Sequence, residues 1–314
     1  MIRKIAALSL LGACLFVSAC GQKPQAEFIF PDKPFPDPFN RAYNLTQSKD
    51  GNVRVFAKET RDDTDLFEMR KQADGSWSEP KKLEFPKRHF NTNPHFSPYD
   101  GRMYFATDRA LPNLEFNNDN NIWSVELKDD GWGEPKPVAG DINTGAKETS
   151  VAMTADGTMY FTSKYPHPGS AGSQDIYKAT FDKNAGEWKM SMLPKHVNSF
   201  LVEDHVAVTP DGQHIFFYST KGPKFGMSDI VAVSRTDAEG MEGWTKPYNI
   251  GGLVNTRGIE LGPEVSTDGK TFFFSREGKL MSLPMDVLLA DMAKARTAAE
   301  TDQVDAFIKS YSQD

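Results

Sequence analysis

The chain has 314 residues, with 36 Lys and Arg against 43 Asp and Glu, so its formal net charge is −7. An acidic chain without a basic stripe lacks the phosphate-neutralising charge that nucleic-acid binding needs, which excludes that class of function. Both cysteines, Cys14 and Cys20, fall among the first twenty residues, so the rest of the chain has no disulfide, thiolate metal site or cysteine nucleophile.

The first twenty residues are typical of a secretory signal. Arg3 and Lys4 give a positive start, and the apolar run 5–17 is too short for a comfortable membrane span. The following "VSAC" resembles the lipobox of bacterial lipoproteins, in which the cysteine is diacylated and becomes the mature N-terminus. This resemblance implies lipidation at Cys20, and Gly21 after it implies sorting to the outer membrane. An ordinary signal peptide with a chance cysteine is the alternative.

Beyond this leader, five Asp-Gly pairs recur at intervals of 50, 56, 55 and 57 residues. Each is followed by an alternating, strand-like run, such as "TMYFTSK" after Gly157. Asp-Gly suits a tight hairpin turn, because Gly adopts positive φ freely and Asp tolerates it. A period of this size indicates repeated supersecondary units that share a core. The pairs are Asp50-Gly51, Asp100-Gly101, Asp156-Gly157, Asp211-Gly212 and Asp268-Gly269.

Two more strands are predicted in each unit. A third strand opens at Asp65, Asn121, Asp175 and Asp229 in the first four units. A tryptophan then marks an outermost strand, where proline is tolerated because an edge strand can do without one donor. The tryptophans are Trp77, Trp132, Trp188 and Trp244. Four antiparallel strands per unit, repeated five times, predict an all-β fold, a five-bladed β-propeller, with a sixth degenerate blade as the alternative.

The repeat also carries a family resemblance. The pattern "E-x-x-P/V-x-x-T/S-x-D-G-x-x-x-x-F-x-S…D-I-Y" resembles the WD40-like units of TolB-type propellers over roughly residues 40–285. Such propellers are common in periplasmic and outer-membrane lipoproteins of Gram-negative bacteria. The resemblance implies the fold and a role as an interaction platform, and it leaves the activity open.

The fifth unit ends without a tryptophan strand, so its fourth strand must come from elsewhere. Residues 26–30, "AEFIF", are available to complete it. We therefore divide the chain into a lipoprotein signal at 1–19, an anchor, linker and closing strand at 20–39, a propeller at 40–285 and a helical segment at 286–314.

The helical segment has apolar residues at helical spacing. We expect this stripe to pack against the flank of the propeller, and a docking helix for a partner is the alternative. The residues are Leu288, Met292, Ala295, Val304, Phe307, Ile308 and Tyr311.

Carboxylates recur seven or eight positions before several of the Asp-Gly turns, at the start of the first strand of a unit. In a propeller this strand lines the central channel, so we expect these side chains to converge at one mouth. Close carboxylates bind a cation, pair with basic residues or hold a proton at raised pKa. The predicted mouth residues are Asn93, His95, Glu148, Glu203, Asp204, His205 and Glu260.

Three roles are open for these residues. They could hydrogen-bond to neighbouring blades and hold the ring together, or they could bind a ligand or Ca²⁺. They could also catalyse glycan hydrolysis, with Glu148, Glu203 and Glu260 as candidate acids. The last role follows from a resemblance to five-bladed glycoside hydrolases similar to arabinanases, carried by "FPDPFNRAYNL" around Asp37 and by "IELGPEV" with Glu264. No other cofactor and no protein metal site is expected.

Together these patterns predict a non-catalytic lipoprotein anchored in the outer membrane through Cys20. It faces the periplasm, with exposure on the cell surface left open, and its propeller binds an envelope protein or a cell-envelope glycan. A five-bladed enzyme similar to glycoside hydrolases is the alternative.

Overall fold

A computed structural model describes residues 25–29, 41–59, 63–85, 89–112, 119–129, 131–164, 174–219, 225–301, 303, 306 and 309–311. The predicted signal segment, the lipidation site Cys20 and the candidate Asp37 lie outside the described residues. So do Val304, Phe307 and Ile308.

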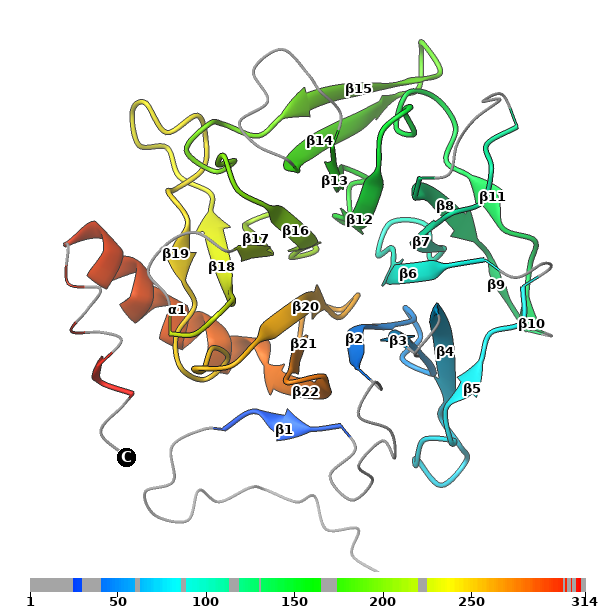
Figure 1. Cartoon of the computed structure of the whole chain (residues 1–314), viewed down its shortest axis with the longest axis horizontal. Helices are drawn as coiled ribbons and strands as arrows, with labels where there is room; N and C mark the ends of the chain where they lie inside the picture. Colours follow the sequence, from blue (N-terminus) through cyan, green and yellow to red (C-terminus); the bar gives the residue numbers. More distant parts are fainter. Residues whose placement is uncertain are drawn as a thin grey trace, which may run out of the picture.

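Five four-stranded antiparallel sheets stand around a common axis, each with its first strand innermost (Figure 1). Blade 1 holds β2 (Ala42–Gln47), β3 (Val53–Glu59), β4 (Thr64–Arg70) and β5 (Lys81–Lys82). Blade 2 holds β6 (Asn91–Phe96), β7 (Met103–Thr107), β8 (Asn121–Val125) and β11 (Lys136–Pro137), and the hairpin β9 (Leu127–Lys128) with β10 (Gly131–Trp132) follows β8. Blade 3 holds β12 (Glu148–Met153), β13 (Met159–Ser163), β14 (Asp175–Asp182) and β15 (Glu187–Met192). Blade 4 holds β16 (Glu203–Val208), β17 (His214–Ser219), β18 (Asp229–Ser234) and β19 (Tyr248–Asn249). Blade 5 holds β20 (Glu260–Val265), β21 (Thr271–Arg276), β22 (Lys279–Pro284) and β1 (Glu27–Phe28). The prediction of five blades of four strands is confirmed.

The ring is closed by a strand from the N-terminal side of the chain, as the missing fourth strand of the last unit predicts. In β1, Glu27 pairs with Ser282 and Phe28 with Met281, antiparallel to β22. The carbonyl of Leu280 accepts a further hydrogen bond from the next residue of the chain, Ile29, over 3.0 Å. Blade 5 is therefore assembled from both ends of the domain.

The Asp-Gly turns all lie at one end of the blades, between the first and second strands. Their glycines have φ between 69° and 86°, the left-handed region that the turn requires. Turns of neighbouring blades also touch, because Lys49 Nζ donates to Pro98 O over 3.2 Å and Ala155 N–H donates to Pro210 O over 2.8 Å. These contacts link successive blades at this end of the ring.

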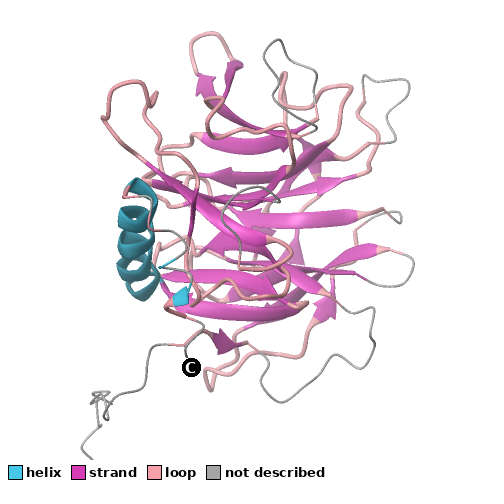
Figure 2. Ribbon diagram, turned by 60° about the vertical axis from the view of Figure 1, so that its left-hand side comes forward, coloured by secondary structure: helices cyan, strands magenta, loops and turns pink. Residues whose placement is uncertain are grey.

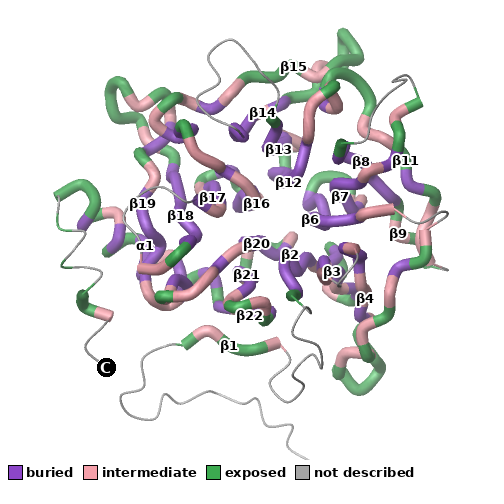
Figure 3. Tube along the Cα trace, in the orientation of Figure 1, coloured by how far each residue is buried: buried purple, intermediate pink, exposed green. Residues whose placement is uncertain are grey.

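The core fills the spaces between neighbouring blades, in five apolar clusters. Between blades 1 and 2, for example, Val55 packs with Phe96 and Phe105. Most residues of the inner strands are buried, and most exposed residues lie at the perimeter (Figure 3). Since each blade buries both faces against its neighbours, its second strand carries large apolar residues on both sides.

Helix α1 (Met285–Glu300) lies along the flank of the ring (Figure 2). Leu288, Met292 and Ala295 are buried in the cluster that also joins blades 4 and 5. Tyr311, beyond the helix, donates from its hydroxyl to Asp291 Oδ2 over 2.5 Å. No helix among the described residues is long and apolar enough to cross a membrane.

The tryptophans differ from the prediction, because only Trp188 lies in an outermost strand. Trp132 belongs to the hairpin β9–β10, and Trp77 and Trp244 form isolated bridges. The outermost strands of blades 1, 2 and 4 are only two residues long and begin after the tryptophan.

Candidate functional site

The first strand of every blade contains one extra residue relative to the second strand. In blades 1, 2, 4 and 5 the third residue of this strand has positive φ: 48° at Asn44, 49° at Asn93, 52° at His205 and 62° at Gly262. A bulge of this kind re-aims side chains and is over-represented beside functional sites. The bulges lie toward the end of the ring opposite to the Asp-Gly turns.

A connected set of polar residues surrounds the axis at this end, and we call it the mouth cluster. It consists of Tyr43, Asn44, Thr92, Asn93, Thr149, Asp204 and His205. Tyr43 Oη lies 3.0 Å from Thr92 Oγ1, which joins blades 1 and 2. The side-chain amide of Asn93 donates to the carbonyl of Thr149, which joins blades 2 and 3.

Hydrogen bonds through blade 4 complete the circuit. Thr149 Oγ1 donates to Asp204 Oδ1 over 2.8 Å, and His205 Nδ1 lies 2.7 Å from Asn44 Oδ1 in blade 1. Blade 5 adds no side chain to the mouth cluster, but its Gly262 packs closely against the backbone of blade 1. A Cβ on Gly262 would lie 2.7 Å from the backbone nitrogen of Asn44.

Asp204 carries the negative charge of the mouth cluster. Asp204 and His205 each keep an acceptor atom that no described residue uses, and both residues are half-buried. Burial lowers the pKa of His205, so its ring is neutral at pH 7. Its Nδ1–H donates to Asn44 Oδ1, which leaves Nε2 with a lone pair. Burial acts to raise the pKa of Asp204, but attraction to His205 and hydrogen bonds from His205 N–H, Thr149 and Thr162 lower it below its usual value. No hydrogen bond among the described residues uses Asp204 Oδ2 or His205 Nε2.

Aromatic rings flank these acceptors. The Tyr43 ring lies edge-on to the His205 ring with centroids 5.6 Å apart, and the Tyr218 ring lies 6.2 Å away. The arrangement therefore suits a ligand that donates hydrogen bonds and also presents an apolar face.

The three candidate catalytic acids lie elsewhere, each at the start of its own blade. Glu148, Glu203 and Glu260 are at most 1% exposed. Each accepts hydrogen bonds from the backbone N–H and the hydroxyl of a Thr or Ser four residues earlier. No hydrogen bond or ion pair among the described residues joins one of these acids to another.

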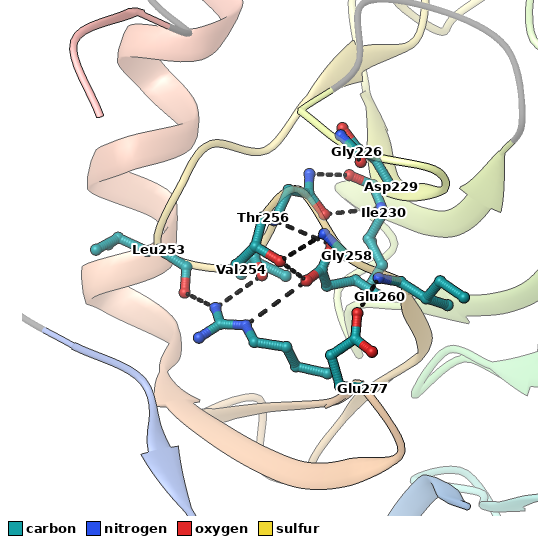
Figure 4. A network of polar contacts seen from close by, with 12 residues as sticks. Gly226, Asp229, Ile230, Leu253, Val254, Thr256, Gly258, Glu260 and Glu277 are labelled. Atoms are coloured by element: carbon teal, nitrogen blue, oxygen red, sulfur yellow. Dashed lines mark hydrogen bonds and ion pairs between the residues drawn. The ribbon is translucent and has the colours of Figure 1, made fainter. Parts of the chain in front are cut away.

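The surroundings of Glu260 show the pattern in full (Figure 4). Thr256 donates to it from its N–H over 3.0 Å and from its hydroxyl over 2.5 Å. Arg276 Nε lies 3.7 Å from Glu260 Oε1, and its Nη2 donates to the carbonyls of Leu253 and Val254. Burial raises the pKa of Glu260, although the hydrogen bonds from Thr256 oppose this.

Glu148 has the same arrangement with Thr144, and Ser163 Oγ donates to it over 2.9 Å. Burial raises the pKa of Glu148 to about 7, against the opposing effect of these hydrogen bonds.

An asparagine precedes each of these Thr or Ser residues and bonds to the blade before. Asn198 accepts from Ile176 N–H over 2.9 Å and donates to Ile176 O over 3.1 Å. Asn143 and Asn255 bond in the same way to Ile122 and Ile230. The segment between two blades is therefore hydrogen-bonded at both ends. Its Asn bonds to the third strand of one blade, and its Thr or Ser bonds to the Glu that begins the first strand of the next. We call this arrangement the inter-blade staple.

His95 lies deeper in the ring than the mouth cluster and is 2% exposed. Its Nε2 accepts from Met153 N–H over 2.9 Å, so its Nδ1 carries the proton that faces Glu264 Oε1 at 2.7 Å. Burial raises the pKa of Glu264, although attraction and hydrogen bonding from His95 oppose this. The pair joins blades 2, 3 and 5 inside the ring.

Of the predicted mouth residues, the structure brings Asn93, Asp204 and His205 together in one connected set. The other four are buried in separate local networks. Sequence reasoning missed Tyr43, Asn44 and the asparagines of the staple. The recurring "N-[T/S]-x-x-x-E" at 143–148, 198–203 and 255–260 was a readable signal for the staple.

Within the described part of the chain, no group of three or more His, Cys, Asp or Glu is placed to hold a metal ion. Calcium at the mouth stays a prediction.

No protein-family model matches the sequence, and no curated protein matches it. Solved structures do resemble it. TolB from Acinetobacter baumannii has 15% identity and a TM-score of 0.44, over 78% of this chain and 54% of that one. The chain thus spans about half the length of that protein.

Two solved structures of enzymes also resemble the chain. An α-L-arabinofuranosidase from Lactobacillus brevis has 14% identity and a TM-score of 0.49, over 79% of this chain and 92% of that one. A gluconolactonase from Xanthomonas campestris has 12% identity and a TM-score of 0.46, over 85% and 96%. At these identities the likeness concerns the fold, which hosts both binding proteins and enzymes. The chain is a five-bladed β-propeller, and its resemblance to TolB-type propellers holds at the level of that fold.

Proposed function

We propose that the chain is a non-catalytic binding protein of the cell envelope, tethered to the outer membrane through Cys20. Its ligand binds at the mouth cluster. The observation that carries this proposal is the state of the three candidate acids. Each is buried and occupied by a backbone amide and a hydroxyl of its own linker, so none presents a free carboxyl group to a substrate.

The chemistry of the mouth cluster favours a cell-envelope glycan over a protein as its ligand. Asp204 Oδ2 and His205 Nε2 are acceptors, and the hydroxyl groups of a sugar are donors. The adjacent ring of Tyr218, which is half-buried, offers apolar surface to the C–H groups of a sugar ring. An envelope protein is the alternative ligand.

Backbone strain at the mouth supports a functional role. A non-glycine residue at positive φ costs on the order of 1–3 kcal/mol, and such strain clusters at functional sites. Asn44, Asn93 and His205 all have this conformation.

The test is a glycan array that carries muropeptides and lipopolysaccharide core oligosaccharides. We expect binding by the wild-type protein and its loss in Asp204→Asn and His205→Gln variants that still unfold in one cooperative thermal transition. Asp211→Asn, the same exchange in an Asp-Gly turn at the opposite end, is the matched control. Binding that survives both mouth substitutions would refute the assignment of the site.

One observation favours the alternative, an enzyme similar to glycoside hydrolases. Burial raises the pKa of Glu148 to about 7, which is the property of a general acid. Release of sugar from arabinan or xylan oligosaccharides, abolished in Glu148→Gln, would establish catalysis and replace the binding proposal.

A further inference from the structure

The outermost strand of blade 3 differs from those of the other blades. β15 has six residues, whereas β1, β5, β11 and β19 have two each. Exposed strand edges are normally protected by shortness, proline or charge. β15 contains no proline, and its one lysine, Lys189, is held by an ion pair of 2.6 Å to Asp182. In Figure 1, β15 lies at the perimeter of the ring.

The outward-facing backbone groups of β15 can be assigned from its pairing with β14. Leu193 N–H donates to the carbonyl of Ile176, which lies directly opposite in the register. Residues of an antiparallel pair alternate between bonding to the partner strand and facing away from it. Lys189 and Ser191 therefore bond to β14. The N–H and C=O groups that face away belong to Trp188, Met190 and Met192, and no described strand pairs with them.

The side chains of these three residues share one face and line a pocket. Phe161 and Tyr177 form its apolar floor, and its volume is about 220 Å³. Pockets for drug-sized ligands measure roughly 300–1,000 Å³, so this one suits a single side chain. Phe181, 46% exposed and edge-on to Trp188 at 5.3 Å, extends the apolar surface along the hairpin.

The charge beside the pocket indicates the charge that a bound ligand would carry. Asp141 is the one charged residue in its lining, and it is exposed. Within the described ranges, no ion pair involves Asp141. A basic group of an incoming ligand would meet an uncompensated carboxylate there.

We propose that β15 is a docking edge for an extended segment of a partner protein. The segment adds as a fifth strand to blade 3, places one apolar side chain in the pocket and a basic residue beside Asp141. Main-chain hydrogen bonds supply affinity in such complexes and side-chain pockets supply specificity. This surface is separate from the mouth cluster, so the inference goes beyond the proposed function.

The probe is a synthetic peptide of about ten residues in which leucine and threonine alternate, with arginine near one end. Its binding to the full-length protein is measured by fluorescence anisotropy. Met190→Pro removes one outward-facing N–H without removing a bond to β14. The structure already holds a proline in the same situation, because Pro137 in β11 faces away from β8. Met190→Ala removes the side chain and keeps the N–H, and is the matched control.

We expect Met190→Pro to weaken peptide binding about tenfold, the effect of losing roughly one main-chain hydrogen bond. Met190→Ala retains most of the affinity, Asp141→Asn weakens binding a few-fold, and a peptide N-methylated at alternate amides does not bind. Asp204→Asn at the mouth leaves peptide binding unchanged, which separates this proposal from the glycan proposal.

Four results would overturn the proposal. The first is that the wild-type protein does not bind the peptide at millimolar concentration, and the second is that the N-methylated peptide binds equally well. The third is that a Met190→Pro variant with native melting temperature retains full affinity for the peptide. The fourth is that sedimentation shows a wild-type dimer that Met190→Pro abolishes, because the edge is then occupied by a second copy of the chain.

Discussion

Asn198→Ala gives the sharpest test of the inter-blade staple. Asn198 is 1% exposed and makes three hydrogen bonds to the backbone of blade 3, two with Ile176 and one with the carbonyl of Leu193. Each such bond contributes about 1 kcal/mol, and a buried group left without a partner costs about 1–3 kcal/mol. The substitution leaves the N–H of Ile176 without its acceptor. We therefore expect it to lower the free energy of unfolding by about 3–5 kcal/mol.

The assay is urea denaturation. We expect a lower midpoint concentration of urea and an unchanged slope of the free energy of unfolding against urea concentration. The melting temperature falls by about 6–15 °C, at roughly 2–3 °C per kcal/mol for a domain of this size. The matched control is Asn184→Ala, because Asn184 is exposed in the turn between β14 and β15. It should change stability by less than about 0.5 kcal/mol. A loss below about 1 kcal/mol in Asn198→Ala would show that the staple does not hold the blades together.

Three further predictions concern the mouth and the anchor. Gly262→Ala should destabilise the fold by about 2 kcal/mol or more, because its φ is 62° and the new Cβ would lie 2.7 Å from Asn44 N; an unchanged melting temperature would contradict this. Burial lowers the pKa of His205, so the unfolded chain binds its proton more readily than the folded one and stability falls as the pH drops below about 6.5. In His205→Gln the urea midpoint should therefore differ less between pH 5.5 and pH 7.5 than it does in the wild-type protein. The same difference in both proteins would contradict this role of His205. Cys20→Ala should abolish acyl labelling and globomycin-sensitive processing of the chain; persistent labelling would argue against the anchor.

Local sequence signals account for most of the fold. The Asp-Gly turns, the alternating strands and the absent last tryptophan predicted five blades and the closing strand, since each is a short-range pattern. The staple is also local, because Glu203 bonds to Ser199 only four residues away. It could have been read from the repeat of Asn, Thr or Ser, and Glu.

The candidate site depended on contacts between distant parts of the chain. His95 and Glu264 are separated by 169 residues, and His205 and Asn44 by 161. Both histidines lie in first strands with the same bulge, but His95 is the fifth residue of β6 and His205 is the third residue of β16. In the sequence they lie five and six residues before their Asp-Gly turns, so sequence reasoning placed both at the mouth.

The closing strand has a consequence for the order in which the protein forms. Blades 1 to 4 are each built from one continuous stretch of chain, so each can assemble as soon as it has been synthesised. The last blade needs residues 27–28, which are synthesised before every other strand of the ring. These residues must stay unpaired until β22 exists, and they then bear any pull that a tether at the N-terminal side exerts on the folded ring.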